Sequence, residues 1–580
     1  MVFESLYRSL DLPKNASVPD FVLRKIPGDQ TEDKELIFPS PFWTRAQAKS
    51  LTLADIRDGA YGMATELLAP DVEGGPWEKN DVGLFVTENQ YDYLLVSLGL
   101  MQIGAIPALL NPQYKGVELE DIMHKVHPRA MFVSVATFPA VEDAVKSYAA
   151  KGDKKPVIYV FDQVHERNIY RLLIDPGKKR RANGDNSLEK VKIDPITQTA
   201  VYCFSSGTSG PPKVVCLSHF NLIANVVQIT VALGGRVNKP RFDDANWFDQ
   251  PIGPPQDGIN EFHLSILPQF HCYGLLTAIA TLFTGTPCVV FSKFDVKNFF
   301  IAVEKYKVTF MFVVPPILLA LASSPLAAEY DLGSIKSFAS GAATLSKELC
   351  DLVRERRGIP VTDGYGMTEM SPIISLQTTR DIESGRLNVG RLVPNTDARV
   401  IDLSTGKDVG EDVPGELWLR GPQLMLGYLD NNEANEKSFS PSPADMNHFF
   451  NTGDIVSIDK DGFVTIHDRV KDIIKFNGYQ VSASELEGLA QKNEYVLQAA
   501  VAGVVDHSNA VHNELPWAFV VSNEKGQDVP EEKRTKSLLT LVNSRVPGYK
   551  KLRGVTWLNA LPTSSAGKIL KRELRSMVKI

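Results

Sequence analysis

Short runs of apolar and β-branched residues alternate with amphipathic segments along the first two thirds of the chain. The runs that predict strands span residues 82–86, 131–135, 157–161, 201–204 and 310–314. Between them, apolar residues recur every three or four positions, as over residues 91–101, which is the spacing of one helix face. Alternation of this kind predicts an α/β fold in which helices cover parallel or mixed sheets.

Beyond about residue 398 the pattern becomes β-rich, with short strands at 398–401 and 416–419 separated by glycine and proline. Residues 451–469 alternate on both sides of Asp461-Gly462 and predict a β-hairpin. We therefore expect a small β-barrel-like subdomain within a large N-terminal domain that is made of several subdomains.

The last hundred residues carry enough pattern for a small α+β domain of their own. Strands are predicted at 499–505 and 517–521, with one helix near 537–543 and another after a capping box formed by Ser484 and Glu487. The expected units are an N-terminal domain over 1–467, a hinge at 468–471 and a mobile C-terminal domain over 472–580.

Composition excludes several classes of function. With 580 residues, 43% of them hydrophobic, and a formal net charge of −7, the chain can form a large core but has no basic excess for nucleic acid. Its five cysteines are scattered singly, which argues against a disulfide framework or a structural metal. No apolar stretch approaches the roughly 18 residues of a membrane span, and no signal peptide is visible. The basic run 178–181 and the Pro/Gly-rich segment 236–260 are expected to be surface loops.

The strongest chemical signal is the segment YCFSSGTSGPPKVVCLSH, residues 202–219. A strand ends at Phe204, a loop of serine, threonine and glycine follows, and a helix is expected to begin near Ser218. Glycine N–H groups and hydroxyls suit phosphate oxygens, and Lys213 adds a compact positive charge. The loop is not that of P-loop NTPases, because Pro211 and Pro212 interrupt the required pattern. Taken alone, it is also compatible with an unspecialised polar loop.

This loop resembles the phosphate loop of the adenylate-forming superfamily, which includes acyl-CoA synthetases, luciferases and peptide-synthetase adenylation domains. Further segments follow in the family's order: LPQFHCYGL (267–275), SGAATLSKEL (340–349), DGYGMTE (363–369), TGD (452–454), DRVKDIIKFNGYQVSASELE (468–487) and SSAGKILKREL (564–574). Their details are most similar to 4-coumarate–CoA ligase-like enzymes. The resemblance implies an AMP-forming acid–thiol ligase that uses ATP, Mg²⁺ and coenzyme A to make an acyl-adenylate and then an acyl-CoA thioester.

The resemblance also implies a nucleotide site. The residues expected to bind ATP or AMP are Ser205, Ser206, Gly207, Thr208, Ser209, Gly210, Lys213, Gly341, Ala342, Ala343, Asp363, Gly364, Tyr365, Gly366, Met367, Thr368, Asp454, Arg469 and Lys568. Within this set, Tyr365 would stack on adenine and Asp454 would accept hydrogen bonds from the ribose hydroxyls. Glu369 and Thr208 would hold Mg²⁺, a cation that prefers oxygen ligands.

Adenylation brings together two anions, a carboxylate and the α-phosphate of ATP, so it needs positive charge and alignment. By resemblance, Lys568 bridges these two groups, and the expected catalytic residues are Lys568, His271, Lys213, Thr368 and Glu369. Lys471 matches the family's hinge. The positions that match the coenzyme A side are Lys475, Asn477 and Gly478.

The acyl pocket is expected to be apolar. The positions that match the family's pocket are His271, Tyr273, Leu276, Phe291, Ala339, Pro372, Ile373 and Ile374. Plant relatives carry, at the position of Ala339, a lysine that meets the hydroxyl of hydroxycinnamates, so a buried phenol would lack that partner here. We therefore expect an apolar aromatic or medium-chain aliphatic acid in preference to 4-coumarate.

Three departures from the family's pattern leave alternatives open: Val214 replaces a glycine, Asp363 a glutamine and Asn477 a lysine. The last departure bears on the thioester step, so the acceptor is alternatively a carrier protein, or oxygen in a luciferase-like oxidation. A non-catalytic nucleotide-binding scaffold is the third interpretation. A cytoplasmic location is expected, with a peroxisomal one as the alternative because Val578-Lys579-Ile580 resembles a Ser-Lys-Leu address. No nucleic-acid partner is expected, and a homodimer is compatible with the sequence.

Overall fold

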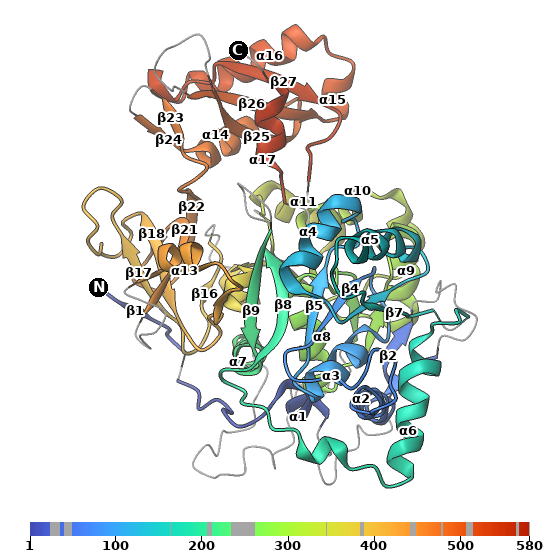
Figure 1. Ribbon diagram of the computed structural model, residues 1–580. Helices are drawn as coiled ribbons and strands as arrows, with labels where there is room; N and C mark the ends of the chain where they lie inside the picture. The colour runs from blue at the N-terminus through green and yellow to red at the C-terminus, as the bar shows by residue number, and fades with distance from the viewer. Residues whose placement is uncertain are drawn as a thin grey trace.

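The computed structural model describes residues 1–578 apart from residues 8, 24–34, 40–48, 163, 206–211, 234–261, 344, 383–387, 441–447, 477–478, 506–513 and 564–567. The predicted loop 236–260 and most of the phosphate loop therefore lie outside the described residues. A large body of sheets and helices carries a smaller unit, which runs from β23 to α17 and lies to one side of the body beyond β22 (Figure 1).

The largest sheet has seven strands in the order β19-β9-β8-β5-β4-β6-β7. Their bounds are β4 Val82–Val86, β5 Ile106–Leu110, β6 Ala130–Val133, β7 Val157–Val160, β8 Thr199–Ser205, β9 Lys213–Ser218 and β19 Gly427–Tyr428. Strands β8, β5, β4, β6 and β7 pair in parallel. Strand β9 pairs antiparallel with β8, and β19 pairs antiparallel with β9. On one face lie α4 (Gly116–Val126) and α5 (Phe138–Ala150), and on the other lie α2 (Leu53–Leu67) and α3 (Tyr93–Gln102). The predicted α/β architecture is confirmed.

Strand β9 was not expected from the sequence. The helix that follows it, α7 (His219–Ala232), begins where predicted, because the Ser218 hydroxyl accepts a hydrogen bond from the N–H of Asn221. Between the loop and this helix, residues 214–217 are buried in the sheet. Although apolar runs predicted strands elsewhere in the chain, a short run directly before a helix is equally compatible with a buried part of that helix.

A second, five-stranded sheet has the order β12-β13-β14-β15-β16. Its strands are β12 Phe310–Val313, β13 Ser337–Ser340, β14 Val361–Gly366, β15 Ile373–Leu376 and β16 Arg391–Leu392. The helices α8 (Cys272–Thr284), α10 (Pro315–Ser323) and α11 (Lys347–Arg357) pack around it. A four-stranded sheet beside it, in the order β10-β11-β2-β3, comprises β10 His263–Ser265, β11 Cys288–Val290, β2 Glu35–Pro39 and β3 Leu51–Thr52.

The β-rich region forms an antiparallel six-stranded sheet. Its strands are β1 Phe3–Glu4, β17 Asp397–Ile401, β18 Gly415–Arg420, β20 Phe439–Ser440, β21 Phe449–Ile458 and β22 Val464–Arg469. The predicted hairpin is the β21–β22 pair, and Gly462 in its turn has a φ of 78°, a conformation that glycine adopts without strain. The helix α13 (Asn432–Ser438) packs between β19 and this sheet.

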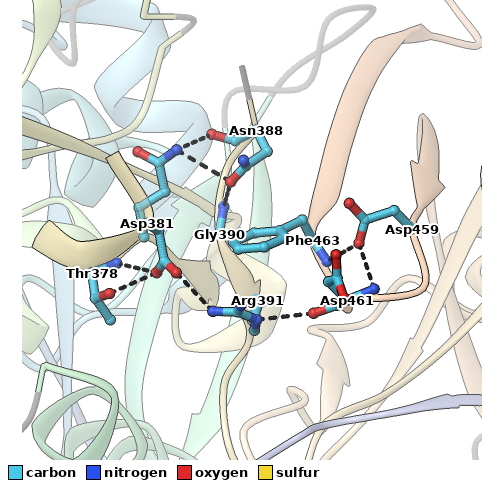
Figure 2. Close-up of polar contacts among 9 residues, drawn as sticks. Thr378, Asp381, Asn388, Gly390, Arg391, Asp459, Asp461 and Phe463 are labelled. Carbon is cyan, nitrogen blue, oxygen red and sulfur yellow. Dashed lines mark hydrogen bonds and ion pairs between the residues drawn. The ribbon is translucent and has the colours of Figure 1, made fainter. Parts of the chain in front are cut away.

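A polar network joins the five-stranded sheet to this hairpin. Arg391 on β16 donates through its Nη1 to Asp381 Oδ1 at 2.7 Å and through its Nε to the Asp461 carbonyl at 2.9 Å. Its guanidinium also lies 3.8 Å from the ring of Phe463 (Figure 2). The hairpin is thereby held against the edge of the five-stranded sheet.

The smaller unit contains an α+β arrangement with its own apolar core. Its elements are β23 Ile474–Phe476, β24 Tyr479–Val481, α14 Ala483–Ala490, β25 Val496–Val505, β26 Glu514–Ser522, α16 Glu531–Asn543, β27 Gly554–Leu558 and α17 Lys571–Met577. The predicted capping box is wrong, because α14 begins two residues earlier and Ser482 caps it by accepting from the N–H of Glu485. Ser484 instead donates to the His467 carbonyl, and Glu487 pairs with Lys571 at 2.9 Å.

The basic run 178–181 is also not the loop that was expected. It lies in α6 (Asp175–Ala182), where Arg180 pairs with Glu66 at 2.7 Å and with Asp71 at 2.6 Å. These ion pairs hold α6 on α2, so tertiary contacts outweigh the local signal of proline, glycine and asparagine. Within the described residues, helices of the length and apolarity of a membrane span are absent.

Candidate active site

The strand β14 and the hairpin β21–β22 bring the predicted adenine and ribose residues together. The Tyr365 hydroxyl donates to Asp454 Oδ2 at 2.5 Å, and Arg469 Nε lies 2.9 Å from Asp454 Oδ1. Asp454 and Arg469 are direct cross-strand partners, and Asp454 is buried. A buried carboxylate that is hydrogen-bonded and paired on both oxygens is well suited to hold two adjacent hydroxyls of a sugar.

The segment Asp363–Gly366 approaches its neighbours too closely for side chains at its glycines. A Cβ on Gly366 would lie 2.4 Å from the carbonyl oxygen of Pro372, so only glycine lets this strand run beside β15. Opposite it, a Cβ on Gly341 would be 3.4 Å from the ring of Tyr273. Ala342 follows with a φ of 67°, a conformation that is uncommon for a residue with a side chain. The predicted nucleotide-binding strip, residues 341–343, and Tyr365 thus converge at the carboxyl ends of β13 and β14.

Asp363 is half-buried at this point, and the desolvation of its carboxyl raises its pKa to about 8. The Gln377 side chain accepts from the Asp363 N–H at 2.9 Å. Gln377 Nε2 in turn donates to the Asn388 carbonyl at 2.8 Å, and Asn388 Oδ1 accepts from the Gly390 N–H at 2.8 Å (Figure 2). Asp363 is therefore connected to the Arg391 network by a short chain of hydrogen bonds.

Lys213 and Glu369 form a second part of the site. Lys213 is the first residue of β9, and its Nζ lies 4.3 Å from the ring centre of Tyr428. Glu369, in the short helix η5 (Thr368–Met370), is buried and accepts from the Tyr428 hydroxyl at 2.8 Å. Burial, followed by the charge of Lys471, lowers the pKa of Lys213. Ser205 ends β8, whereas Ser206, Gly207, Thr208, Ser209 and Gly210 lie outside the described residues.

Lys568 lies within this group of charges. Burial and the neighbouring Arg469 lower the pKa of its ammonium to about 8, while Asp454, Asp472 and Glu369 act in the opposite direction. It precedes α17, which is anchored in the smaller unit by the Lys571–Glu487 ion pair and by Arg575, 3.6 Å from Asp472. The C-terminal segment therefore delivers a lysine to residues of the large body.

His271 is the N-cap of α8, and its Nδ1 accepts from the N–H of Tyr273 at 3.3 Å. Burial lowers the pKa of this imidazole to about 4, with a further contribution from the charge of Lys568. The ring is thus neutral at physiological pH. Its position beside Lys568 places it at the border between the nucleotide residues and the apolar pocket.

Most of the predicted pocket residues pack into one apolar cluster. Tyr273, Leu276, Ala339, Ile373 and Ile374 belong to it, and the Tyr273 hydroxyl donates to the Ala339 carbonyl at 3.3 Å. Pro372 precedes β15 and follows Ser371 through a cis bond. Phe291 instead packs into a separate core with α9 (Val296–Tyr306) and α10.

Phe312, which the sequence did not single out, packs against the predicted pocket residue Tyr273. Its ring lies 5.8 Å from that of Tyr273. The register of β12 and β13 pairs Phe312 with Ala339, and the sequence alone does not reveal that pairing.

The remaining predicted residues lie around the hinge. Lys471 follows β22, where the N–H of Val470 donates to the Gly453 carbonyl at 2.9 Å. Lys475 is exposed on β23, and its N–H donates to Glu514 Oε2 at 2.9 Å. Asn477 and Gly478 fall outside the described residues.

The comparison with known proteins agrees with this arrangement. Residues 30–429 match the family described as AMP-binding enzyme. A probable 4-coumarate–CoA ligase 1 from Dictyostelium discoideum is 32% identical over 507 residues, which cover 86% of this chain and 86% of that protein. The chain belongs to the AMP-binding enzyme family. The predicted resemblance is confirmed, and so, at the level of the family, is the class of AMP-forming acid–thiol ligase.

Other relatives extend the similarity. The peroxisomal OPC-8:0-CoA ligase 1 of Arabidopsis thaliana is 32% identical, with coverage of 86% of this chain and 84% of that protein. Among solved structures, ATP-bound MatB from Rhodopseudomonas palustris has a TM-score of 0.77 at 23% identity, covering 97% of this chain and 99% of its own. AMP-bound O-succinylbenzoate coenzyme A synthetase from Bacillus subtilis gives a TM-score of 0.70 at 21% identity, with coverage of 94% and 96%. These structural similarities show the shared fold.

Proposed function

We propose that this member of the AMP-binding enzyme family is an acyl-CoA ligase for an apolar aromatic or medium-chain aliphatic acid. One observation carries the proposal: Lys568, from the C-terminal segment, lies half-buried near Arg469, Asp454 and His271, and His271 is the N-cap of the helix that carries Tyr273 and Leu276 of the predicted acyl pocket. A carboxylate with its acyl chain in that pocket would meet Lys568 at the point where the α-phosphate of ATP arrives.

In the proposed adenylation step, the charged residues align two anions and offset their repulsion. Tyr365 and the strip at 341–343 hold adenine, Asp454 and Arg469 hold the ribose, and Lys213 holds the outer phosphates. Lys568 bridges the attacking carboxylate oxygen and the α-phosphate, and pyrophosphate leaves. His271, which is neutral, borders the carboxylate without adding charge.

The described residues fit a magnesium ion. They contain no group of three side chains of the kind that holds a metal on its own. Mg²⁺ bound with ATP needs only one or two protein carboxylates, because phosphate oxygens and water complete its shell. Glu369 supplies one buried carboxylate close to Lys213. When bound, the ion would neutralise charge on the phosphates.

The proposed second step transfers the acyl group to the thiol of coenzyme A with release of AMP. Lys471 at the hinge and Lys475, Asn477 and Gly478 beside it are the proposed contributors to this step. The domain limits of 1–467, 468–471 and 472–580 are part of the same proposal, supported by the separate apolar core of the smaller unit. An acceptor other than coenzyme A is the second candidate, because Asn477 replaces the family's lysine.

The choice of acid follows from the pocket lining. Ala339 is buried, and its neighbours Tyr273 and Phe312 present mainly ring surface. The Tyr273 hydroxyl is already directed to a backbone carbonyl. A buried phenol without a partner would cost about 1–3 kcal/mol, which disfavours 4-coumarate relative to its unhydroxylated analogue.

Pyrophosphate release with a panel of acids, with and without coenzyme A, tests the proposal. Hexanoate, cinnamate and phenylacetate are expected to exceed 4-coumarate, and acyl-CoA is expected to form only when the thiol is present. Preference for 4-coumarate would refute the pocket argument. Adenylation without thioester would favour another acceptor, and light or carbon dioxide release with oxygen would indicate luciferase-like chemistry.

The location in the cell remains a proposal with two alternatives. The cytoplasm is our expectation, and the peroxisome is the alternative, supported by the C-terminal tripeptide and by the similarity to the peroxisomal ligase of Arabidopsis thaliana. Imaging of the chain tagged at its N-terminus, with and without residues 578–580, distinguishes them.

A further inference from the structure

Tyr428 lies between two residues of opposite charge in the proposed nucleotide site. Its hydroxyl donates to Glu369 Oε1 at 2.8 Å, and its ring faces the Lys213 ammonium at 4.3 Å. Tyr428 and Glu369 are both buried. In the part of the chain that the structure describes, Lys213 and Glu369 form no direct ion pair, although the charge of Glu369 acts to raise the pKa of Lys213.

The backbone fixes Tyr428 in this position. Through β19 it pairs with Val215 on β9, two residues from Lys213. The side chain of Asn435 on α13 accepts from the Tyr428 N–H at 2.8 Å and donates to its carbonyl at 3.0 Å. The backbone N–H and carbonyl of Tyr428 are thus both hydrogen-bonded. This limits the freedom of the residue to leave the space between the two charged groups.

The two contacts use different parts of one side chain. A phenol hydroxyl is a hydrogen-bond donor to a carboxylate, whereas the face of an aromatic ring attracts a cation. Burial, together with the charge of Glu369, raises the pKa of Tyr428, so the hydroxyl keeps its proton at any pH at which the protein works. Without this side chain, the half-buried Lys213 ammonium and the buried Glu369 carboxylate would be free to approach one another as an ion pair.

We propose that Tyr428 is a positioning residue that keeps Lys213 and Glu369 apart, so that the lysine remains directed to the outer phosphates and the carboxylate to the metal ion that accompanies them. The inference deepens the proposed function and rests on it. It separates two roles: the hydroxyl orients the carboxylate, and the ring orients the ammonium.

Two substitutions separate these roles. Tyr428→Phe removes the hydroxyl and keeps the ring, whereas Tyr428→Leu removes both. Tyr159→Phe is a matched control, because Tyr159 is a buried tyrosine on β7, at the opposite edge of the same sheet. Calorimetry measures ATP binding with excess EDTA and with Mg²⁺, scanning fluorimetry measures the melting temperature, and pyrophosphate release gives the Mg²⁺ concentration for half-maximal rate.

For Tyr428→Phe we expect the half-maximal Mg²⁺ concentration to rise about tenfold, as for the loss of one hydrogen bond to a charged group. Its affinity for ATP in EDTA should stay within about twofold of the wild type, because the ring still faces Lys213. For Tyr428→Leu, the affinity for ATP in EDTA should fall as well, by about fivefold or more. The control should change neither quantity.

An unchanged Mg²⁺ dependence in Tyr428→Phe would overturn the inference. A lower melting temperature with both binding profiles unchanged would also overturn it, since that is the result of a purely structural role. Equal loss of metal-free ATP binding in both variants would refute the separation of roles. Failure of the proposed function would be distinct, because the wild-type chain would then release no pyrophosphate with any acid of the panel.

Discussion

The surroundings of Lys568 disfavour its charged form. Raising the pH should therefore lower the rate of adenylation at pH values where an ordinary lysine side chain stays protonated. Burial is the largest cause and Arg469 the next, and together they outweigh Asp454, Asp472 and Glu369. The pKa consequently falls from 10.5 to about 8. The perturbation is a change of assay pH from 7 to 9, with acid and ATP well below saturation.

The size of the effect follows from this pKa. A fall from 10.5 to about 8 corresponds to about 3 kcal/mol against the charged form. Lys568 would then be about nine-tenths protonated at pH 7, half protonated at pH 8 and about one-tenth protonated at pH 9. If only the charged form bridges the carboxylate and the α-phosphate, kcat/KM for adenylation should fall about tenfold between pH 7 and pH 9.

Saturation with ATP should shift this decline in the rate of adenylation to a higher pH. The bound polyphosphate adds negative charge beside Lys568 and favours its protonated form. The profile of kcat is therefore expected to decline at a higher pH than that of kcat/KM, because kcat/KM reports the unliganded enzyme. The assay is pyrophosphate release with one acid of the panel, followed from pH 6.5 to 10 at constant ionic strength.

Two variants make the test specific. Lys568→Ala should lower the rate by a hundredfold or so and abolish the decline, while nucleotide binding stays within a few-fold. In Lys568→Arg the guanidinium stays charged throughout the range, so the residual rate should show no decline near pH 8. A wild-type profile that stays flat to pH 9.5, or the same decline in Lys568→Ala, would refute the assignment.

Asp363 gives a second pH-dependent prediction, this time for stability. Because burial raises its pKa to about 8, its contribution to stability is fully present below about pH 4 and is lost as the pH rises through 8. Asp363→Asn should therefore melt above the wild type at pH 9 and approach it as the pH falls toward 4 in scanning fluorimetry, and a constant difference would contradict this. Arg391→Met should raise the KM for ATP about fivefold and leave that for the acid unchanged, because it removes two contacts to the hairpin and leaves Asp381 buried without its ion pair. Arg391→Lys, which keeps the charge, should restore part of the loss in the same kinetic assay, and equal changes in both KM values would indicate general damage instead.

Local patterns predicted the fold wherever one element is governed by its own periodicity. The buried parallel strands β4 and β12 appear as apolar runs, and the hairpin β21–β22 appears as alternation around a glycine turn. The errors occurred where distant contacts decide. The basic run became α6 because Glu66 and Asp71, more than 100 residues earlier, pair with Arg180.

The candidate site shows the same contrast between what local motifs predict and what distant contacts decide. Motifs gave Lys213, Tyr365, Asp454 and Lys568, and the structure brings these residues together. Tyr428 was missed because its role depends on the register between β19 and β9, strands that are some 200 residues apart in sequence. No spacing within a single segment carries that information.

The arrangement of charge suits the nucleotide that we propose for this site. Lys213, Lys471, Arg469 and Lys568 face mainly Glu369, Asp454 and Asp472, and Asp363 is neutral near pH 7 because burial raises its pKa. Lowered pKa values at both Lys213 and Lys568 are the expected result of confining like charges away from water. A bound polyphosphate supplies the missing negative charge and should raise both values. Binding of ATP would therefore offset the repulsion among these cations. This favours the nucleotide over smaller, less charged ligands.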